Sequence, residues 1–456
     1  MTLRGATVAR HTIVGLSMLL TLSTWGAYGQ NGWAPTAADL SPLRGKRPIA
    51  FSWDSLGIGI QLPRTTASNP AEVHRAAKAG FRFARNDLDW EWVDDGKGHY
   101  DFSIYDREVE LNARHGIRMV YILISHAFIA NPNNPKWNLR TPEGIKRFSA
   151  FAAAAAGHFK GKGVIWEVWN EPDGNFWRPK PDADEFYSLL VEVTRAIRKA
   201  DPSAIVIAPG AGQAIHPLTK EENTFLKTLL QRGMLEHVDG VSVHPYQAGG
   251  KPENAVAGYE KLREWIRQYA PKGKRTAIVC SEWGYEDYIK WRNIGYVRGR
   301  QARYVVRQFL VNLWQGVPLQ IYFTWKASKS YGLLEDDGTP KPAFKAVNTV
   351  LKTLRGFQYI GRLPAKREDE YFLHFSDGKR HAVVVWLGVD AGAENAPLQT
   401  RPCALPLPAG RGVIISMFGK RTPVSWAEGG LKIMLSEEPQ LVIYEEQRWT
   451  SSRKQD

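Results

Sequence analysis

The sequence predicts an α/β fold, a (β/α)8 TIM barrel followed by a small, sandwich-like all-β domain at the C-terminus. Between residues 49 and 357, short apolar runs of strand character alternate with helical patterns eight times. Regular alternation of this length is typical of a barrel of parallel strands wrapped by helices. After residue 357 the apolar runs continue, but the helical patterns stop. The second domain is therefore expected to consist of strands alone.

The predicted barrel elements follow from local patterns. The strands are expected at 49–53, 81–88, 117–124, 164–171, 204–210, 240–246, 276–283 and 319–325. The helices are expected at 70–79, 101–115, 143–158, 182–200, 222–233, 253–269, 296–315 and 341–354. Asn69 before Pro70 and Thr141 before Pro142 are helix-start signals. The glycines at the far ends are typical helix stops, namely Gly80, Gly116 and Gly316.

A doubly wound sheet is the alternative fold. It requires a glycine-rich phosphate turn directly after the first strand. The segment "DSLGIGIQLP" that follows 49–53 has the wrong glycine spacing, and we interpret it as a loop. The barrel is therefore the preferred prediction.

The expected domain boundaries come from changes in composition along the chain. They are a signal peptide (1–29), an N-terminal extension (30–47), the barrel (48–357), the small β domain (358–447) and a polar tail (448–456). A hairpin is predicted around Asp377-Gly378, since Asp-Gly is a preferred hairpin turn. Further strands are expected at 412–419, 431–437 and 439–446.

The N-terminus has the pattern of an export signal. Arg4 and Arg10 precede an apolar run at 12–29, and Ala27 and Gly29 supply the small residues of a cleavage site. An uncleaved anchor is the alternative. We predict a secreted or periplasmic protein without stable membrane insertion after cleavage of the signal, and we expect a monomer.

Composition narrows the choice of partners. The 456 residues carry a formal charge of +14, which could indicate nucleic acid, an acidic polymer or an anionic surface. The Lys and Arg residues are scattered, so no nucleic-acid partner is predicted. Cys280 and Cys403 are the only cysteines, and two buried free thiols are favoured over one bridge. They offer too few ligands for a Cys/His metal site.

Polar side chains gather at the predicted strand ends. Because the C-terminal ends of barrel strands meet on one face, these side chains are expected to converge there. They are Arg85, Asn86, Asp87, His126, Asn170, Glu171, His244, Tyr246, Glu282, Trp283, Trp325 and Lys326. Two carboxyl groups among hydrogen-bonding and aromatic side chains are what glycoside hydrolysis requires.

Two segments carry a family resemblance. "WEVWNEPD" on the fourth predicted strand and "IVCSEWGY" on the seventh resemble the paired glutamate motifs of the clan A glycoside hydrolases. "VHPY" on the sixth strand and a tryptophan on the eighth extend the resemblance over the whole barrel. Within the clan the chain looks nearest to family 39, which includes β-xylosidases and exopolysaccharide endoglycosidases. Family 5, the cellulase-like enzymes, is the close competitor.

The resemblance implies roles for five residues. Glu171 becomes the general acid/base and Glu282 the nucleophile of a retaining double displacement, with carboxyl groups about 5–5.5 Å apart. Asn170 is expected to bind the substrate 2-hydroxyl, while Tyr246 and Arg85 keep Glu282 ionised. Neighbouring indoles and the charge of Glu282 are expected to raise the pKa of Glu171. No metal or other cofactor is required.

Other residues have two interpretations each. Glu167 is interpreted as an interior carboxylate paired with Arg82 or Arg85. His126 and His244 are either core histidines or contacts to substrate hydroxyls. The indoles of Trp53 and Trp177 are either core or substrate platforms, and Trp325 is the better platform because it ends a strand. Lys326 is either a surface lysine or a contact to an acidic substituent. Asp173 is either a supporting residue or a cap.

The predicted function is thus hydrolysis of β-glycosidic bonds in a polysaccharide, endo-acting on a bacterial exopolysaccharide. An exo-acting β-xylosidase or a plant-cell-wall hydrolase is the alternative within this class. A catalytically silent sugar-binding barrel is the alternative outside it, but binding alone requires neither Glu171 nor Glu282. A transglycosylase would use the same residues.

Overall fold

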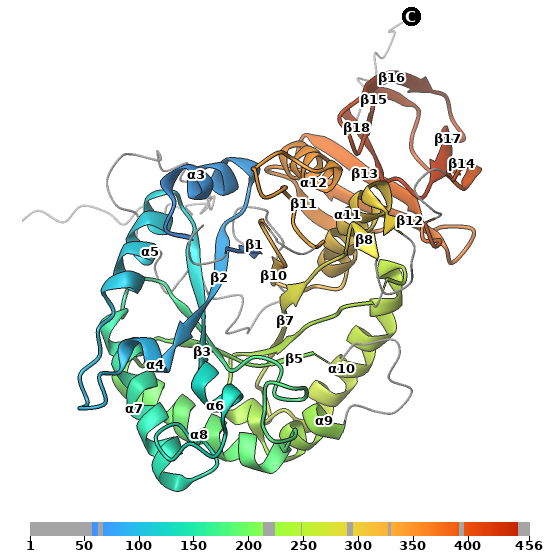
Figure 1. Cartoon of the computed structure of the whole chain (residues 1–456). Coiled ribbons are helices and arrows are strands. Elements are labelled where there is room, and N and C mark those ends of the chain that lie inside the picture. The colour runs from blue at the N-terminus through green and yellow to red at the C-terminus, as the bar shows by residue number, and fades with distance from the viewer. Residues whose placement is uncertain are drawn as a thin grey trace, which may run out of the picture. The chain divides into compact units, whose positions relative to one another are not determined.

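The barrel is closed and parallel. The computed structural model describes residues 57–62, 67–212, 224–247, 249–289, 295–326, 330–391 and 396–445. Eight strands close in the order β1-β10-β7-β6-β5-β4-β3-β2, and helices surround them (Figure 1). The predicted fold class is confirmed.

Most barrel elements fall within or close to their predicted ranges. The strands are β1 (Gly57–Gln61), β2 (Phe83–Asp89), β3 (Arg118–Ile124), β4 (Ile165–Val168), β5 (Ile205–Ala211), β6 (Gly240–Val243), β7 (Ala277–Trp283) and β10 (Leu319–Tyr322). The main helices are α3 (Pro70–Ala79), α5 (Ser103–Arg114), α7 (Pro142–His158), α8 (Ala183–Ala200), α9 (Thr224–Gln231), α10 (Ala255–Tyr269), α11 (Arg298–Trp314) and α12 (Pro342–Thr353). Short elements that we did not predict lie in the connections: α4 (Trp90–Val93), α6 (His126–Ala130), η2 (Met234–Glu236), η3 (Pro252–Asn254), β8 (Tyr288–Ile289) and β9 (Gly295–Tyr296).

The prediction for the first strand was wrong. The barrel is closed by β1, within the segment that we interpreted as a loop, and residues 49–53 lie outside the described residues. The strand is hard to recognise because Gly57 and Gly59 interrupt its apolar pattern. A Cβ on Gly59 would lie 2.2 Å from Ile321 Cδ1, so the close approach of neighbouring strands excludes a side chain there.

The helix caps agree with the sequence signals. The Asn69 side chain accepts hydrogen bonds from the first turn of α3, and the Thr141 side chain accepts one from Gly144 in α7. Gly80 ends α3 in the left-handed conformation, with φ of 111°.

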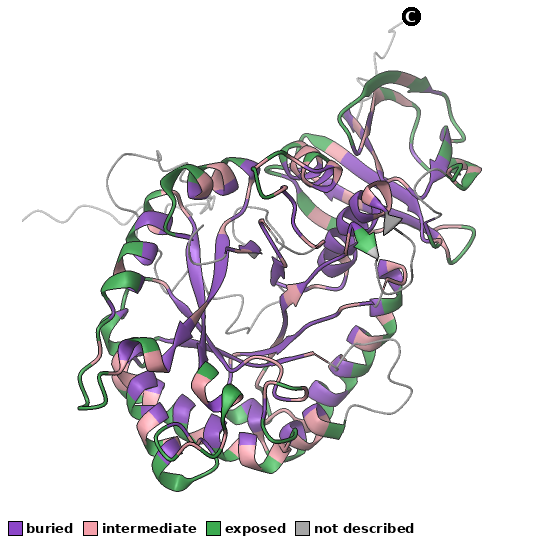
Figure 2. Cartoon of the chain, viewed as in Figure 1, coloured by how far each residue is buried: buried purple, intermediate pink, exposed green. Residues whose placement is uncertain are grey.

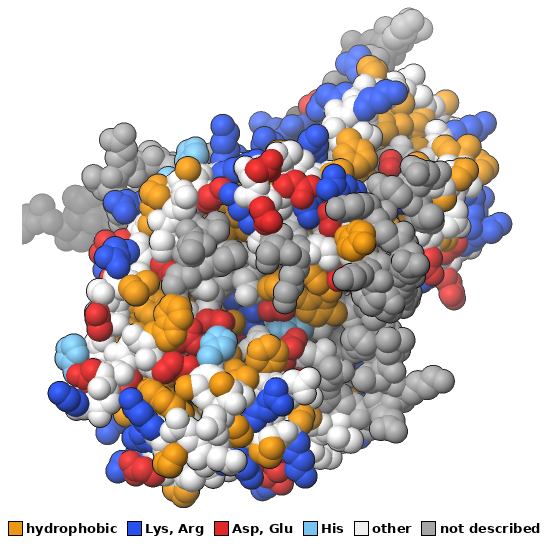
Figure 3. Space-filling model, viewed as in Figure 1, with side chains coloured by type: hydrophobic (Ala, Val, Ile, Leu, Met, Phe, Trp, Pro, Cys, Tyr) orange, Lys and Arg blue, Asp and Glu red, His pale blue; other side chains and the backbone are white. Residues whose placement is uncertain are grey.

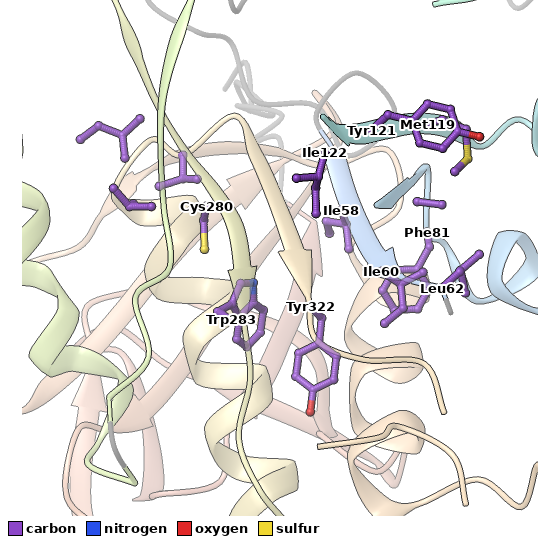
Figure 4. Packing of buried hydrophobic residues seen from close by; sticks show 14 of the residues in the cluster. Ile58, Ile60, Leu62, Phe81, Met119, Tyr121, Ile122, Cys280, Trp283 and Tyr322 are labelled. Atoms are coloured by element: carbon purple, nitrogen blue, oxygen red, sulfur yellow. The ribbon is translucent and has the colours of Figure 1, made fainter. Parts of the chain in front are cut away.

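Two apolar layers hold the barrel. The strands are almost wholly buried, whereas the helices bury one face and expose the other (Figure 2). The interior layer comprises Phe83, Val120, Ile165, Ile205, Ile207, Val279, Leu319 and Ile321. Alternate strand residues point outward into a second layer, in which Trp283 of β7 and Tyr322 of β10 lie side by side with ring centroids 5.0 Å apart (Figure 4). Interior and exterior positions therefore alternate along each strand.

The C-terminal strands are antiparallel. One sheet has six strands in the order β11 (Gln358–Arg362), β12 (Glu370–Ser376), β13 (Arg380–Leu387), β18 (Gln440–Glu445), β15 (Gly410–Ser416) and β16 (Arg421–Trp426). A second sheet pairs β14 (Thr400–Leu405) with β17 (Leu431–Ser436). The predicted Asp377-Gly378 turn joins β12 to β13. The boundaries 358–447 remain a prediction.

The cysteines are both free, but only Cys280 is buried; Cys403 is half-buried. Among the described residues, no helix has the length and apolar character needed to span a membrane.

Candidate active site

Arg85 organises the C-terminal end of the barrel. Its guanidinium is fully buried and lies 2.7 Å from each of three side chains: Nε to Glu167 Oε2, Nη1 to Glu282 Oε2 and Nη2 to Asn170 Oδ1. Glu167 is the interior carboxylate that the sequence indicated, and its partner is Arg85 rather than Arg82. One buried cation therefore joins β2, β4 and β7 and fixes two of the predicted site residues.

Glu282 reaches the cleft through an irregularity in β7. The pairing of β7 with β10 shifts between Cys280 and Trp283, so two residues of β7 face one of β10. The other carboxylate oxygen of Glu282 accepts a hydrogen bond from Tyr246 Oη at 2.8 Å. The side chain is 14% exposed, so it is recessed but reachable.

Glu171 lies just beyond the end of β4 in a backbone conformation unusual for its type. Its φ is 45°, and its backbone N–H donates to Gly210 O at 2.9 Å. Its Oε1 lies 2.8 Å from His244 Nδ1. The left-handed backbone and the bond to β5 turn this side chain back toward the cleft.

The pKa of Glu171 lies below its ordinary value, which corrects our prediction. Burial raises the pKa, but the hydrogen bond from His244 and the positive charges of His244 and Arg85 lower it by more. The pKa of His244 is raised, because the negative charges of Glu282 and Glu171 outweigh its burial. The surroundings of Glu171 are thus cationic rather than aromatic, and the proton of the pair resides on His244. Since His244 is fully buried and bonded to Glu171, the predicted contact with a substrate hydroxyl was also wrong.

The two carboxyl groups face each other closely. A carboxylate oxygen of Glu171, one of Glu282 and a ring nitrogen of His244 all lie within 4.8 Å of one another. Inverting glycosidases hold their carboxyl groups about 6.5–9.5 Å apart, to leave room for water, whereas retaining ones hold them at about 5–5.5 Å. An approach of oxygens within 4.8 Å suits the shorter spacing.

A second set of polar side chains lies at the end of β2 and at the start of α6. Asp87 shares the inward parity of Arg85 and lies one pleat closer to the cleft. His126, at the start of α6, has Nδ1 2.5 Å from Asp89 Oδ1 and Nε2 3.6 Å from Asp87 Oδ2, and its side chain is 47% exposed. Burial and the charge of Asp89 raise the pKa of Asp87 to about 6. Acidic side chains and histidines gather in a hollow on the face shown in Figure 3.

One potential ligand atom from each of Asp87, Asp89 and His126 lies within 4.8 Å of the others, a spacing that a metal ion could use. The hydrogen bond between Asp89 and His126 accounts for their proximity equally well. The expectation of a metal-free site remains a prediction.

Two of the predicted tryptophan platforms were wrong. Trp325 is fully buried, donates its Nε1–H to Glu72 Oε2 at 2.8 Å and packs against Phe81 and Phe344. Trp177 is also fully buried and donates to Glu185 Oε2. Both indoles belong to the core. The third candidate, Trp53, lies outside the described residues.

Phe323 stands where we expected Trp325. It follows β10 directly, is partly exposed, and its backbone N–H donates to Trp283 O at 2.7 Å. Its ring lies 5.7 Å from that of Tyr331, which in turn lies 5.9 Å from the ring of Tyr246. Leu319 and Ile321 face the interior and Phe323 continues that series, but Trp325 shares the same parity, so parity alone does not separate the two residues.

Lys326 is already paired. Its Nζ lies 2.5 Å from Glu72 Oε1, and the same carboxylate accepts the indole N–H of Trp325. Glu72 balances the charge of Lys326, and the contact of this lysine to an acidic substrate stays a prediction.

A (β/α)8 barrel with one glutamate just beyond its fourth strand, Glu171, and another near the end of its seventh, Glu282, is the architecture of a clan A glycoside hydrolase. The family model for cellulase (glycosyl hydrolase family 5) matches residues 68–306, more than half of the 456-residue chain. The chain belongs to this family and is a glycosidase.

Solved structures similar to this chain come from neighbouring families. A family 39 glycoside hydrolase from Bacteroides cellulosilyticus WH2 has a TM-score of 0.71 at 21% identity, covering 87% of this chain and 83% of that one. A monomeric β-xylosidase from Caulobacter crescentus CB15 has a TM-score of 0.62 at 19% identity, covering 88% and 98%. A family 30 endoxylanase from Clostridium papyrosolvens C71 has a TM-score of 0.57 at 13% identity, covering 85% and 94%. These similarities show the shared fold, and both families named from the sequence recur among the matches.

Proposed function

We propose that the chain is a retaining glycoside hydrolase that cleaves β-glycosidic bonds within a bacterial exopolysaccharide, with Glu171 as acid/base and Glu282 as nucleophile. The observation that carries this proposal is the short spacing, within 4.8 Å, of carboxylate oxygens of Glu171 and Glu282. An exo-acting β-xylosidase or a plant-cell-wall hydrolase is the alternative.

In the first step, a carboxylate oxygen of Glu282 attacks the anomeric carbon and the glycosidic C–O bond breaks. The departing oxygen takes a proton from Glu171, which gives the free leaving sugar and a glycosyl ester on Glu282. In the second step, Glu171 removes a proton from water, the hydroxide adds to the anomeric carbon and the ester bond breaks. One water is consumed, and both carboxyl groups return to their starting states.

The hydrogen bonds assign supporting roles. Arg85 and Tyr246 each bond one oxygen of Glu282, which fixes the orientation of the attacking carboxylate. His244 lies 2.8 Å from Glu171 and supplies the proton that this carboxylate needs before the first step. Asn170 is proposed to bind the substrate 2-hydroxyl, and Arg85 orients it by bonding Oδ1. Phe323, whose ring lies beside that of Tyr331, is proposed to provide an apolar face for a sugar ring.

Endo action is supported by exposed side chains beyond the catalytic pair. His126 is 47% exposed, and Trp92 in α4 is 62% exposed. Trp92 lies one helical turn beyond Asp89, which bonds His126. A polar group and a flat indole beside the site suit a second sugar ring.

The proposals for cellular location and oligomeric state are based on the sequence. The leader pattern at 1–29 supports a secreted or periplasmic enzyme, and we propose a monomer that requires no cofactor.

The decisive test is digestion of a panel of purified bacterial exopolysaccharides, xylans and glucans, with products read by mass spectrometry. A ladder of oligosaccharides from an exopolysaccharide is expected. Release of single xylose units would replace our proposal with the exo alternative. Products longer than the starting oligosaccharide would indicate a transglycosylase.

The Glu171–His244 pair also predicts how stability depends on pH. The lowered pKa of Glu171 stabilises the fold above about pH 4.5, and this contribution is lost as the pH falls through the lowered value. The raised pKa of His244 stabilises the fold below about pH 6.5, and this contribution is lost as the pH rises through the raised value. Between about pH 4.5 and 6.5, both groups contribute fully to the stability of the fold. We expect the difference in unfolding free energy between the wild type and His244→Gln to be largest there, measured by urea denaturation. A difference that is constant from pH 4 to 8 would contradict the charged pair.

A further inference from the structure

Two hydrogen bonds join the loops that follow β4 and β5 on either side of Glu171. The Glu171 backbone N–H donates to Gly210 O at 2.9 Å, and the Gly212 backbone N–H donates to Asp173 Oδ1 at 2.9 Å. The pairing of β4 with β5 ends at Glu167 and Ile207, so these bonds continue the contact beyond the sheet. The segment 171–173 is therefore attached to β5 both before and after Pro172.

Gly212 lies directly against the carboxyl group of Glu171. A Cβ placed on Gly212 would lie 2.8 Å from both Oε1 and Cδ of Glu171, and 3.1 Å from its Cγ. The backbone of Gly212 is outside the left-handed region, so an alanine would not be strained by conformation there. The atoms that such a Cβ would displace belong to the flexible end of Glu171, which is the reacting group of the proposed mechanism.

We propose that Gly212, held by Asp173, is a positioning residue that sets the location of the Glu171 carboxyl group. This inference rests on the proposed role of Glu171 as acid/base. In the proposed mechanism, Gly212 contacts neither the substrate nor the bond that breaks. Because glycine has no side chain, the carboxyl group of Glu171 can occupy the space beside Gly212. From this position Glu171 reaches both His244 and the glycosidic oxygen. Displacement of a catalytic group by about 1 Å can cost roughly 10²-fold in rate.

The test uses Gly212→Ala in the full chain, with Gly174→Ala as the matched control. Gly174 lies in the same loop, and a Cβ there would meet only Glu171 O at an ordinary 3.6 Å. The substrates are aryl β-glycosides of the sugar that the wild type releases, with leaving groups from 2,4-dinitrophenol to unsubstituted phenol. Gly212→Ala is expected to lower kcat/KM for the phenyl glycoside by roughly 10- to 100-fold, with little change for the dinitrophenyl glycoside. Equal losses on both substrates would overturn the inference.

A second measurement does not depend on catalysis. The charges facing His244 come from Glu171, Glu282 and Arg85, and displacement of Glu171 removes one of the two that raise its pKa. In chains labelled with ¹⁵N-histidine, with the signal assigned by His244→Gln, the pKa of His244 is expected to fall in Gly212→Ala and to stay unchanged in Gly174→Ala. Asp173→Ala should lower it and Asp173→Asn, which keeps the acceptor oxygen, should not.

The two measurements separate the two proposals. An unchanged His244 titration in Gly212→Ala would overturn the positioning role, whatever the activity. A lowered His244 pKa in a chain that hydrolyses no aryl glycoside or polysaccharide would support the positioning geometry and contradict the proposed function.

Discussion

Glu282→Gly is expected to abolish hydrolysis of the polysaccharide and to regain activity on a 2,4-dinitrophenyl β-glycoside when azide is added. Loss of the nucleophile removes the ester intermediate, and we expect a fall in kcat of about 10⁴-fold or more. The small side chain leaves a cavity from which azide can attack the same face of the sugar that Glu282 attacks. The product should therefore be a glycosyl azide of inverted configuration, identified by NMR coupling constants.

The fold should survive this change, since Arg85 keeps its buried bonds to Glu167 and Asn170. Circular dichroism and the melting temperature provide that check. Glu192→Ala, which removes a half-exposed glutamate from α8, is the control for loss of a carboxyl group. Normal polysaccharide hydrolysis by Glu282→Gly, or an azide product of retained configuration, would contradict the nucleophile role.

The sequence was sufficient for most of the barrel, because the alternation of strands and helices follows from periodic patterns. Strand parity places Arg85 and Glu167 in the interior, and the two motifs place Glu171 and Glu282 at strand ends. Such positions depend only on how far a residue lies along a strand. The bonds that join Arg85 and Tyr246 to Glu282 were implied by the family resemblance.

The sequence was least informative about side chains whose surroundings are set by residues far away in the chain. Trp325 was chosen because it was expected to end a strand, but β10 ends at Tyr322, and the indole beyond it lies in the core. The ion-pair partner of Lys326, Glu72, lies far away in the sequence and could not be predicted from local patterns. The pKa of Glu171 was misjudged because its nearest polar neighbour, His244, comes from another strand. Contacts of this kind depend on the closed barrel and have no local signal.

Gly212 was missed for a related reason. A glycine has no chemistry of its own, and its importance lies in the group that occupies the space beside it.

The second large effect is expected for Glu171→Ala, and it should depend on the leaving group. Without the acid, kcat/KM for polysaccharide or phenyl glycoside should fall by roughly 10²- to 10⁴-fold. A 2,4-dinitrophenyl glycoside needs no protonation to depart, so its first step should remain fast. The second step then lacks its base, so the ester on Glu282 should accumulate, giving a burst of dinitrophenol and a lowered KM.

Azide distinguishes Glu171→Ala from Glu282→Gly by stereochemistry alone. In Glu171→Ala, azide enters beside the missing carboxyl group and attacks the ester from the opposite face. The product should be a glycosyl azide of retained configuration, which is the opposite anomer to the product of Glu282→Gly. His244 loses its partner in this variant, and its raised pKa should fall, as ¹⁵N-histidine titration can measure. The same azide product from both variants would contradict the assignment of distinct roles, because two carboxyl groups on opposite faces of one anomeric carbon cannot direct azide to the same side.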